Sequence, residues 1–289
     1  MDMRFVAQET ISMRPDARRL ISALCERVGK LINGCPQITC EGIGVALPGR
    51  LDPASERLVF APNLGWEPID LKKPLAQASG LSVELENAAN ACALAEIWGK
   101  IQPENVRNLA AITVSEGVGV GLILNGQLVR GATGLAGEFG HVVIQENGPL
   151  CKCGQRGCLE ACASNTAAVR YFAELASPRN ATPAQPAFED LLAMAQAGNL
   201  NARDALRRMA HYLGVGVAML ATGLSPDVIV LVGEVTRAWN LIEGIINGVL
   251  QERSVTGAKP KIIPAGPEAR LRGAVALVTH KYFGAPVTI

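Results

Sequence analysis

The sequence has no excess of charge of one sign and no long apolar run. Its 27 Lys and Arg residues nearly balance its 26 Asp and Glu residues, and the net charge is +1. This balance gives no electrostatic reason to expect binding to nucleic acid or to a membrane surface. The most apolar stretch, Leu213–Leu224, is too short to cross a bilayer, and residues 1–19 contain no apolar signal segment. The sequence therefore predicts a cytoplasmic protein without a membrane partner.

The chain also has no evident internal repeat and no clean linker. Its 289 residues are 49% apolar and 18% charged, which predicts an extensive core and little disorder. Strand and helix patterns alternate, as expected of an α/β protein with layered sheets. The clearest expected elements are a helix at 88–97, strands at 109–114 and 228–232, a glycine-rich loop at 116–121, a hairpin at 122–129, a surface loop at 177–187 and a helix at 205–220.

Four potential metal ligands lie close together in GHVVIQENGPLCKCGQRGCLEAC, namely His141, Cys151, Cys153 and Cys158. Zinc takes imidazole and thiolate ligands in tetrahedral geometry, and four protein ligands leave no position for a catalytic water. The spacing therefore predicts a structural zinc site. Two alternatives stay open here: a buried set of reduced cysteines, and a disulfide framework, which a large intracellular chain disfavours.

The segment Ser115–Cys162 contains a glycine-rich loop, GEFGH and the cysteine cluster in that order. In this it resembles the signature region of the ROK family, which groups bacterial transcriptional repressors with sugar kinases. Matches to the family pattern extend over most of the chain: GVALPG at 44–49, APNLGW at 61–66, ENAAN at 86–90 and PDVIVLVGEV at 226–235.

The resemblance implies a ribonuclease H-like α/β fold of the actin and hexokinase type. In this fold two domains close on a sugar in the cleft between them. The expected domains are residues 1–106, a smaller N-terminal α/β domain completed by 272–289, and residues 107–271, a larger α/β domain with the zinc site.

The resemblance also implies which side chains hold the sugar. They are the Asn of the ENAAN motif, the Glu and His of GEFGH and the Glu after GCL, here Asn87, Glu138, His141 and Glu160. Such groups suit hydroxyls, which both donate and accept hydrogen bonds. His141 is expected to bind zinc through one ring nitrogen and the sugar through the other. Asn63 is a further candidate, with an ordinary turn asparagine as the alternative. His211 and His280 lie away from any motif and are expected to have no role.

Three departures from the pattern of ROK kinases bear on activity. Those kinases have an aspartate at the position of Ala88, which accepts the proton of the attacking sugar hydroxyl. A positioned base contributes about 10²–10⁴-fold in rate. The sequence has no DxGGTxxR-type phosphate motif, so one phosphate clamp and part of the first sheet are expected to be missing. In the second phosphate loop Glu116 is expected to repel a phosphate, and Glu234, on the adenine side, to add to this effect.

These departures favour the sugar-binding effector domain of a ROK-type transcriptional regulator, with structural zinc and no kinase activity. The expected ligand is a hexose or N-acetylhexosamine, and the expected assembly is a homodimer or higher homo-oligomer. DNA would be bound only through a helix-turn-helix domain absent from the 289 residues, which implies a truncation, a misassigned start or a natural remnant.

Two alternatives to the effector domain stay open. The first is a hexose or N-acetylhexosamine kinase that uses ATP and magnesium and in which another carboxylate replaces the base. The second is a zinc-stabilised scaffold that only assembles with partners.

Overall fold

The computed structural model describes residues 6–11, 16–61, 64–99, 106–176, 186–254 and 259–284. The helices in these ranges are α1 Ala17–Asn33, α2 Lys72–Ser79, α3 Ala88–Trp98, α4 Leu159–Ala163, α5 Asn165–Ala176, α6 Phe188–Gln196, α7 Leu200–Leu224, α8 Trp239–Arg253 and α9 Ala269–Phe283. The strands are β1 Ile43–Leu47, β2 Arg50–Leu51, β3 Leu58–Phe60, β4 Val83–Asn87, β5 Leu109–Val114, β6 Val118–Leu124, β7 Gln127–Leu128, β8 Val228–Val232 and β9 Lys261–Ala265. The short 3-10 helices are η2 Glu138–His141 and η3 Glu234–Ala238.

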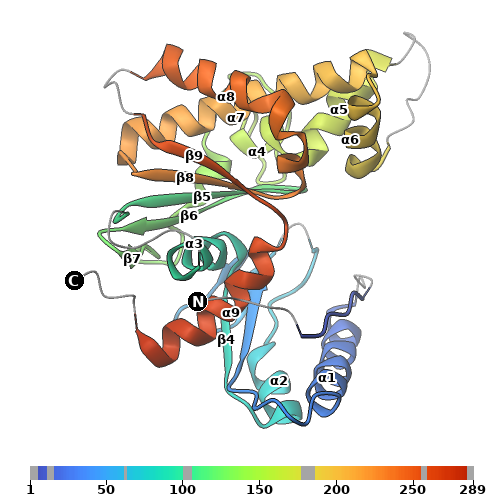
Figure 1. Ribbon diagram of the computed structural model, residues 1–289, viewed down its shortest axis with the longest axis vertical. Coiled ribbons are helices and arrows are strands. Elements are labelled where there is room, and N and C mark those ends of the chain that lie inside the picture. Colours follow the sequence, from blue (N-terminus) through green and yellow to red (C-terminus); the bar gives the residue numbers. More distant parts are fainter. Residues whose placement is uncertain are drawn as a thin grey trace.

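A five-stranded sheet with the order β7-β6-β5-β8-β9 lies in the middle of the molecule (Figure 1). β5, β8 and β9 are parallel, and β6 pairs antiparallel with both β5 and β7. Every side chain of β5 and β8 is buried, because α7 and α8 cover one face of the sheet and α3 and α9 the other. Strands buried on both faces are continuous apolar runs. The strands expected at 109–114 and 228–232 are confirmed at these bounds.

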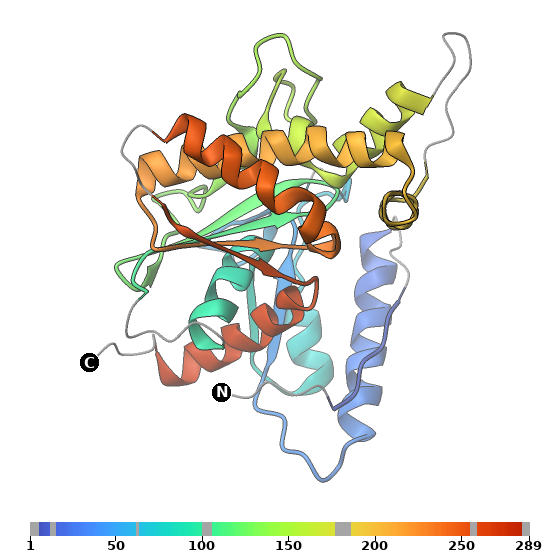
Figure 2. The same ribbon diagram turned by 45° about the horizontal axis from the view of Figure 1, so that its top comes forward.

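Two smaller sheets complete the described strands, and the one that contains β4 lies toward the bottom of Figure 1, below the five-stranded sheet. β1 and β4 form a parallel pair, and β2 and β3 an antiparallel pair. Their apolar side chains form a separate core with α1 and α2, and α1 lies along the outer edge of this part (Figure 2). α9 packs so closely on β1 that a Cβ at Gly44 would lie 1.7 Å from the carbonyl oxygen of Ala274. α9 therefore lies directly against β1, while its buried side chains belong to the core shared with α3 and the five-stranded sheet.

The glycine-rich segment differs from its expected structure. A loop is expected at 116–121, but β6 begins at Val118 and a turn at 115–117 joins it to β5. The prediction of a loop over the whole segment is therefore wrong. α3 packs across β6, and a Cβ at Gly121 would lie 2.2 Å from the carbonyl oxygen of Ala89. Gly121 therefore permits the close approach of a helix to a strand, which is a common use of glycine within strands.

The other expected elements are mostly confirmed where the structure describes them. The helix at 88–97 is α3, the helix at 205–220 lies within α7, and Asn125 and Gly126 form the turn of the hairpin with φ of 52° and 76°. The loop expected at 177–187 falls almost wholly outside the described residues. The division into domains near residue 106 stays a prediction. No helix in the described ranges is both long and apolar enough to cross a membrane.

Candidate functional site

A cleft of about 620 Å³ opens beside the junction of β4 with α3. Its opposite wall comes from the turn between β5 and β6, from η2 and from α4. The structure brings together in this cleft the expected sugar-binding residues Asn87, Glu138, His141 and Glu160, together with Ala88. Asn63 lies outside the described residues. Side chains from three separate segments of the chain therefore face one cavity.

Asn87 ends β4 and caps α3, which places it in the wall of the cleft. Its Oδ1 accepts a hydrogen bond from the N–H of Ala89 at 2.8 Å, and its Nδ2 donates to the carbonyl oxygen of Gly49 at 2.9 Å. These bonds fix the orientation of the amide and leave one Nδ2 hydrogen for a ligand. Ala88, the first residue of α3, adds only a methyl group to the same wall.

Glu138 and His141 are the first and last residues of η2, so one short turn presents both to the cleft. Gly137 precedes them with φ of 94°, and a Cβ there would lie 2.1 Å from the carbonyl oxygen of Val120. Only glycine suits this position. Oε2 of Glu138 lies 3.7 Å from Nε2 of His141. A carboxylate and an imidazole therefore stand side by side at the wall.

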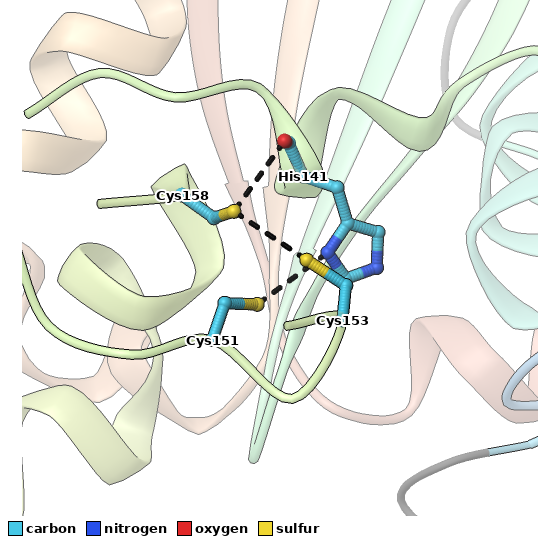
Figure 3. Close-up of side chains that lie close together, drawn as sticks. All are labelled: His141, Cys151, Cys153 and Cys158. Atoms are coloured by element: carbon cyan, nitrogen blue, oxygen red, sulfur yellow. Dashed lines mark hydrogen bonds between the residues drawn. The ribbon is translucent and has the colours of Figure 1, made fainter. Parts of the chain in front are cut away.

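The four expected metal ligands converge from η2 and from the loop before α4 (Figure 3). Their ligand atoms all lie within 4.8 Å of one another. Sγ of Cys153 is 3.7 Å from Sγ of Cys158, and Sγ of Cys151 is 3.6 Å from Nδ1 of His141. Ligands placed about 2.0–2.3 Å from a tetrahedral ion are roughly 3.5–3.8 Å apart. The cluster therefore fits one metal ion, with Nδ1 as the histidine ligand and Nε2 on the side of Glu138.

The cysteines of the cluster are free thiols, as are the other cysteines in the described ranges, so the disulfide alternative is not supported. Burial raises the pKa of Cys151 to about 12 and also raises that of Cys158. At Cys153 burial acts in the same direction, but hydrogen bonds from the backbone of Gln155 and from Cys151 outweigh it and lower the pKa. Because thiolates are the ligands of metals, binding of an ion would displace protons from this cluster.

Glu160, in the first turn of α4, connects the cysteine cluster with the cleft. Its Oε2 accepts a hydrogen bond from the N–H of Val118 at 3.2 Å, and its Oε1 lies 3.6 Å from Sγ of Cys151. The loop can fold back here because Gly157 has φ of 75°, and a Cβ there would lie 1.7 Å from the carbonyl oxygen of Gln145. The metal cluster and one wall of the cleft are therefore built as a unit.

Two charged residues of the cleft were not expected from the sequence. Arg130, which follows β7, binds Oε2 of Glu86 through Nε at 2.9 Å and through Nη2 at 2.8 Å, and both side chains line the cleft. Burial and the positive charge of Arg130 lower the pKa of His280. This histidine of α9 is therefore influenced by the charge of Arg130, although it lies away from any motif in the sequence. The ENAAN motif includes Glu86, but no local pattern relates it to a residue 44 positions later.

A second ion pair lies beside the turn at 115–117. Arg270, in the first turn of α9, donates to Oε1 of Glu234 at 3.2 Å and to the carbonyl oxygen of Val114 at 3.4 Å, and it lines the cleft. Glu116, by contrast, is exposed and is not among the lining residues. Its neighbours Ser115 and Gly117 do line the cleft, and the repulsion of a phosphate by Glu116 stays a prediction. The carboxylate of Glu234 forms an ion pair with Arg270, which offsets its negative charge.

The sequence matches a family model and known proteins, and these matches are to one family. Residues 4–281 match the family model of the ROK family. The chain is 30% identical over 246 residues to the xylose repressor of Bacillus subtilis, an alignment that covers 83% of this chain and 62% of the repressor. It is 33% identical over 253 residues to a glucokinase of Halalkalibacterium halodurans, which covers 83% of this chain and 76% of the glucokinase. The chain thus spans less than two thirds of the repressor.

Among solved structures, the chain resembles a ROK family glucokinase from Streptomyces griseus in complex with glucose and AMPPNP. The TM-score is 0.81 at 30% identity, and the match covers 91% of this chain and 88% of the glucokinase. This likeness confirms the expected ribonuclease H-like fold of the actin and hexokinase type. Repressors and kinases are both among the relatives, so similarity alone does not choose between the two activities.

Proposed function

The chain belongs to the ROK family, and we propose that it is a sugar-binding effector domain without sugar kinase activity. The observation that carries this proposal is Ala88 in the wall of the cleft. The kinases that the sequence resembles have an aspartate there, which accepts the proton of the attacking hydroxyl. A methyl group accepts no proton, and loss of a positioned base costs about 10²–10⁴-fold in rate.

The ion pair between Arg270 and Glu234 supports the same proposal. It lies beside the turn that resembles the second phosphate loop, and its side chains are only 30% and 17% exposed. A nucleotide phosphate that used the Arg270 guanidinium would compete with Glu234 for it, and its negative charge would lie close to a largely buried carboxylate. Weakening the ion pair of a buried charge in this way is costly. We therefore expect ATP to bind weakly.

Of the polar side chains assigned to the sugar, the four that the structure describes all line the cleft. Glu138 and Glu160 offer acceptors, and Asn87 and His141 offer donors. A volume of about 620 Å³ lies within the usual range for small-molecule sites. We propose a hexose or an N-acetylhexosamine as ligand. Because these groups come from opposite walls, a bound sugar would favour closed states of the cleft in proportion to its higher affinity for them.

We further propose that the cluster of His141, Cys151, Cys153 and Cys158 holds one structural zinc ion. The spacing of the ligand atoms and the soft thiolate set support zinc. Zinc supplies the charge that stabilises three thiolates, and it fixes the imidazole through Nδ1. His141 then keeps its proton on Nε2, as a donor toward the cleft. The zinc would shape the sugar site and take no part in chemistry.

The test combines a thermal-shift screen of sugars with a coupled assay of ATP turnover. The panel contains glucose, mannose, N-acetylglucosamine and N-acetylmannosamine, and also xylose because of the similarity to xylose repressors. A sugar at about 100 times its dissociation constant adds roughly 2.7 kcal/mol to stability, or a shift of about 5–10 °C. Ala88→Asp is expected to give no sugar-dependent ATP turnover, because Arg270 stays paired with Glu234. Turnover by the wild type would refute the proposal, and turnover only in the variant would show that Arg270 and Glu234 do not obstruct ATP.

A second candidate is an ATP- and magnesium-dependent hexose or N-acetylhexosamine kinase. The similarity to a glucokinase bound to glucose and AMPPNP favours it. In this case another carboxylate of the cleft, such as Glu138, would accept the proton. Sugar-dependent ATP turnover by the wild type that is lost in Glu138→Gln would establish this candidate. If no sugar binds while zinc content and folding are normal, a scaffold role replaces both.

A further inference from the structure

The pair formed by Arg130 and Glu86 joins the two walls of the cleft. Glu86 belongs to β4, next to Asn87, and Arg130 follows β7 in the segment that leads to η2. The side chain of Glu86 is 10% exposed and that of Arg130 is 50% exposed, so the carboxylate is enclosed while the guanidinium borders the cleft. Two nitrogens of the planar guanidinium, Nε and Nη2, converge on the same carboxylate oxygen, Oε2 of Glu86.

Glu86 organises the wall that carries Asn87. While its Oε2 binds Arg130, its Oε1 accepts hydrogen bonds from the N–H of Asn87 at 2.9 Å and from Nδ2 of Asn90 at 3.1 Å. One carboxylate therefore holds the end of β4, the first turn of α3 and the guanidinium of Arg130. Movement of Arg130 would therefore shift the carboxylate that binds the N–H of Asn87.

Arg130 stands at the base of the loop that carries the opposite wall. Its carbonyl oxygen accepts a hydrogen bond from the N–H of Ala136 at 3.1 Å, which closes the loop just before Gly137 and Glu138. Gly131, Gly134 and Gly137 all have positive φ, between 71° and 94°. Glycine-rich segments lose much conformational entropy on ordering. This loop therefore depends on an anchor to hold Glu138 in place.

We infer that Arg130 and Glu86 are positioning residues, which set the distance between Asn87 on one wall and Glu138 on the other. The inference rests on the proposed sugar binding for its functional meaning, but the anchoring of the loop is independent of any sugar. Lysine would not fully replace Arg130, because its single ammonium group lacks the planar arrangement of Nε and Nη2 that converges on Oε2. Nδ1 of His280 is buried without a hydrogen bond in the described part of the chain, so this nitrogen does not bind Glu86.

The first experiment measures sugar affinity by titration calorimetry in Arg130→Met, Arg130→Lys, Glu86→Gln and the double variant Arg130→Met with Glu86→Gln. Each single variant should weaken binding by about 10-fold, the lower end of the loss seen when a supporting residue is removed from a protein site. The double variant should bind the sugar no more weakly than the single variant with the lower affinity, because both substitutions break the same contact. Additive effects, or a loss in Arg130→Met with none in Glu86→Gln, would overturn the inference and make Arg130 a direct ligand contact.

The second experiment measures hydrogen–deuterium exchange of residues 131–137 without sugar. Exchange should become several-fold faster in Arg130→Met and Glu86→Gln and stay unchanged in Arg207→Met. This control removes an arginine on the surface of α7 whose ion-pair partner within the described ranges is Asp204. Normal zinc content shows that the variants are folded. Unchanged exchange would overturn the inference even if the sugar binds. Faster exchange in a protein that binds no sugar would refute the proposed function and leave the anchoring role intact.

Discussion

Replacement of Glu138 by glutamine separates the binding of a sugar from the stability of the fold. The carboxylate lines the cleft, is 48% exposed and lies 3.7 Å from Nε2 of His141. A hydrogen bond to a charged group is worth about 1.5–3 kcal/mol, and the lower value applies to a half-exposed group. A loss of about 1.5 kcal/mol corresponds to roughly 10-fold weaker binding. Stability should change by less than about 1 kcal/mol, because so exposed a pair contributes little.

The assay is titration calorimetry with the sugar that gives the largest thermal shift, combined with urea unfolding of the same variants. Glu146→Gln is the matched control, because Glu146 is an exposed glutamate of the cysteine loop that does not line the cleft. We expect about 10-fold weaker binding in Glu138→Gln and unchanged binding in Glu146→Gln. Equal affinity of Glu138→Gln and wild type would refute the assignment of this carboxylate to the sugar.

Three further predictions concern the metal, the packing and the effect of pH. Metal analysis of Cys158→Ser should show loss of the zinc ion, and the midpoint of thermal unfolding should fall by at least about 5 °C. The control Cys40→Ser changes an exposed cysteine outside the cluster and should show neither effect. Zinc retained in Cys158→Ser would count against the proposed site. Gly121→Ala should lower the free energy of unfolding, measured in urea, by about 2–3 kcal/mol, because the new Cβ would lie 2.2 Å from the backbone of Ala89. Gly248→Ala, where no atom lies within 4 Å of the new Cβ, should be neutral or slightly stabilising. Equal stabilities of the two variants would refute the packing argument. Burial and the charge of Arg130 lower the pKa of His280 below its usual value of 6.5. The unfolded chain therefore takes up a proton at a higher pH than the folded protein, and the free energy of unfolding should fall as the pH drops below about 6.5. His280→Gln should reduce this fall, and identical stability profiles of variant and wild type against pH would contradict the prediction.

Local patterns in the sequence predict much of the fold and the grouping of the four candidate metal ligands. β5 and β8 are nearly continuous apolar runs, as expected of strands buried on both faces, with Thr113 as the polar residue of β5. The four candidate ligands lie within one stretch from His141 to Cys158, so their closeness along the chain is reflected in their closeness in space. Asn87, Glu138 and Glu160 were placed through the resemblance to a family, and their roles stay predictions.

Contacts between distant segments could not be predicted in the same way. Arg130 meets Glu86 across 44 positions and Arg270 meets Glu234 across 36, and both pairs depend on how α9, β4 and the loops pack. The sequence predicts a loop where β6 lies, because glycine occurs both in flexible loops and where a helix packs closely on a strand. Only the position of α3 against β6 distinguishes these two uses. A turn sequence likewise does not reveal which side chains face a cavity: Ser115 and Gly117 line the cleft, whereas Glu116 between them is exposed and does not.

The central claim is that the cleft holds a sugar without phosphorylating it. Equilibrium dialysis of the zinc-containing protein against a radiolabelled sugar, in the presence of magnesium and ATP, tests this claim most directly. The account predicts that label accumulates on the protein side and that all of it is recovered as the unmodified sugar. Recovery of a sugar phosphate would contradict the loss of kinase activity, and a failure of the label to accumulate at millimolar sugar would contradict the binding.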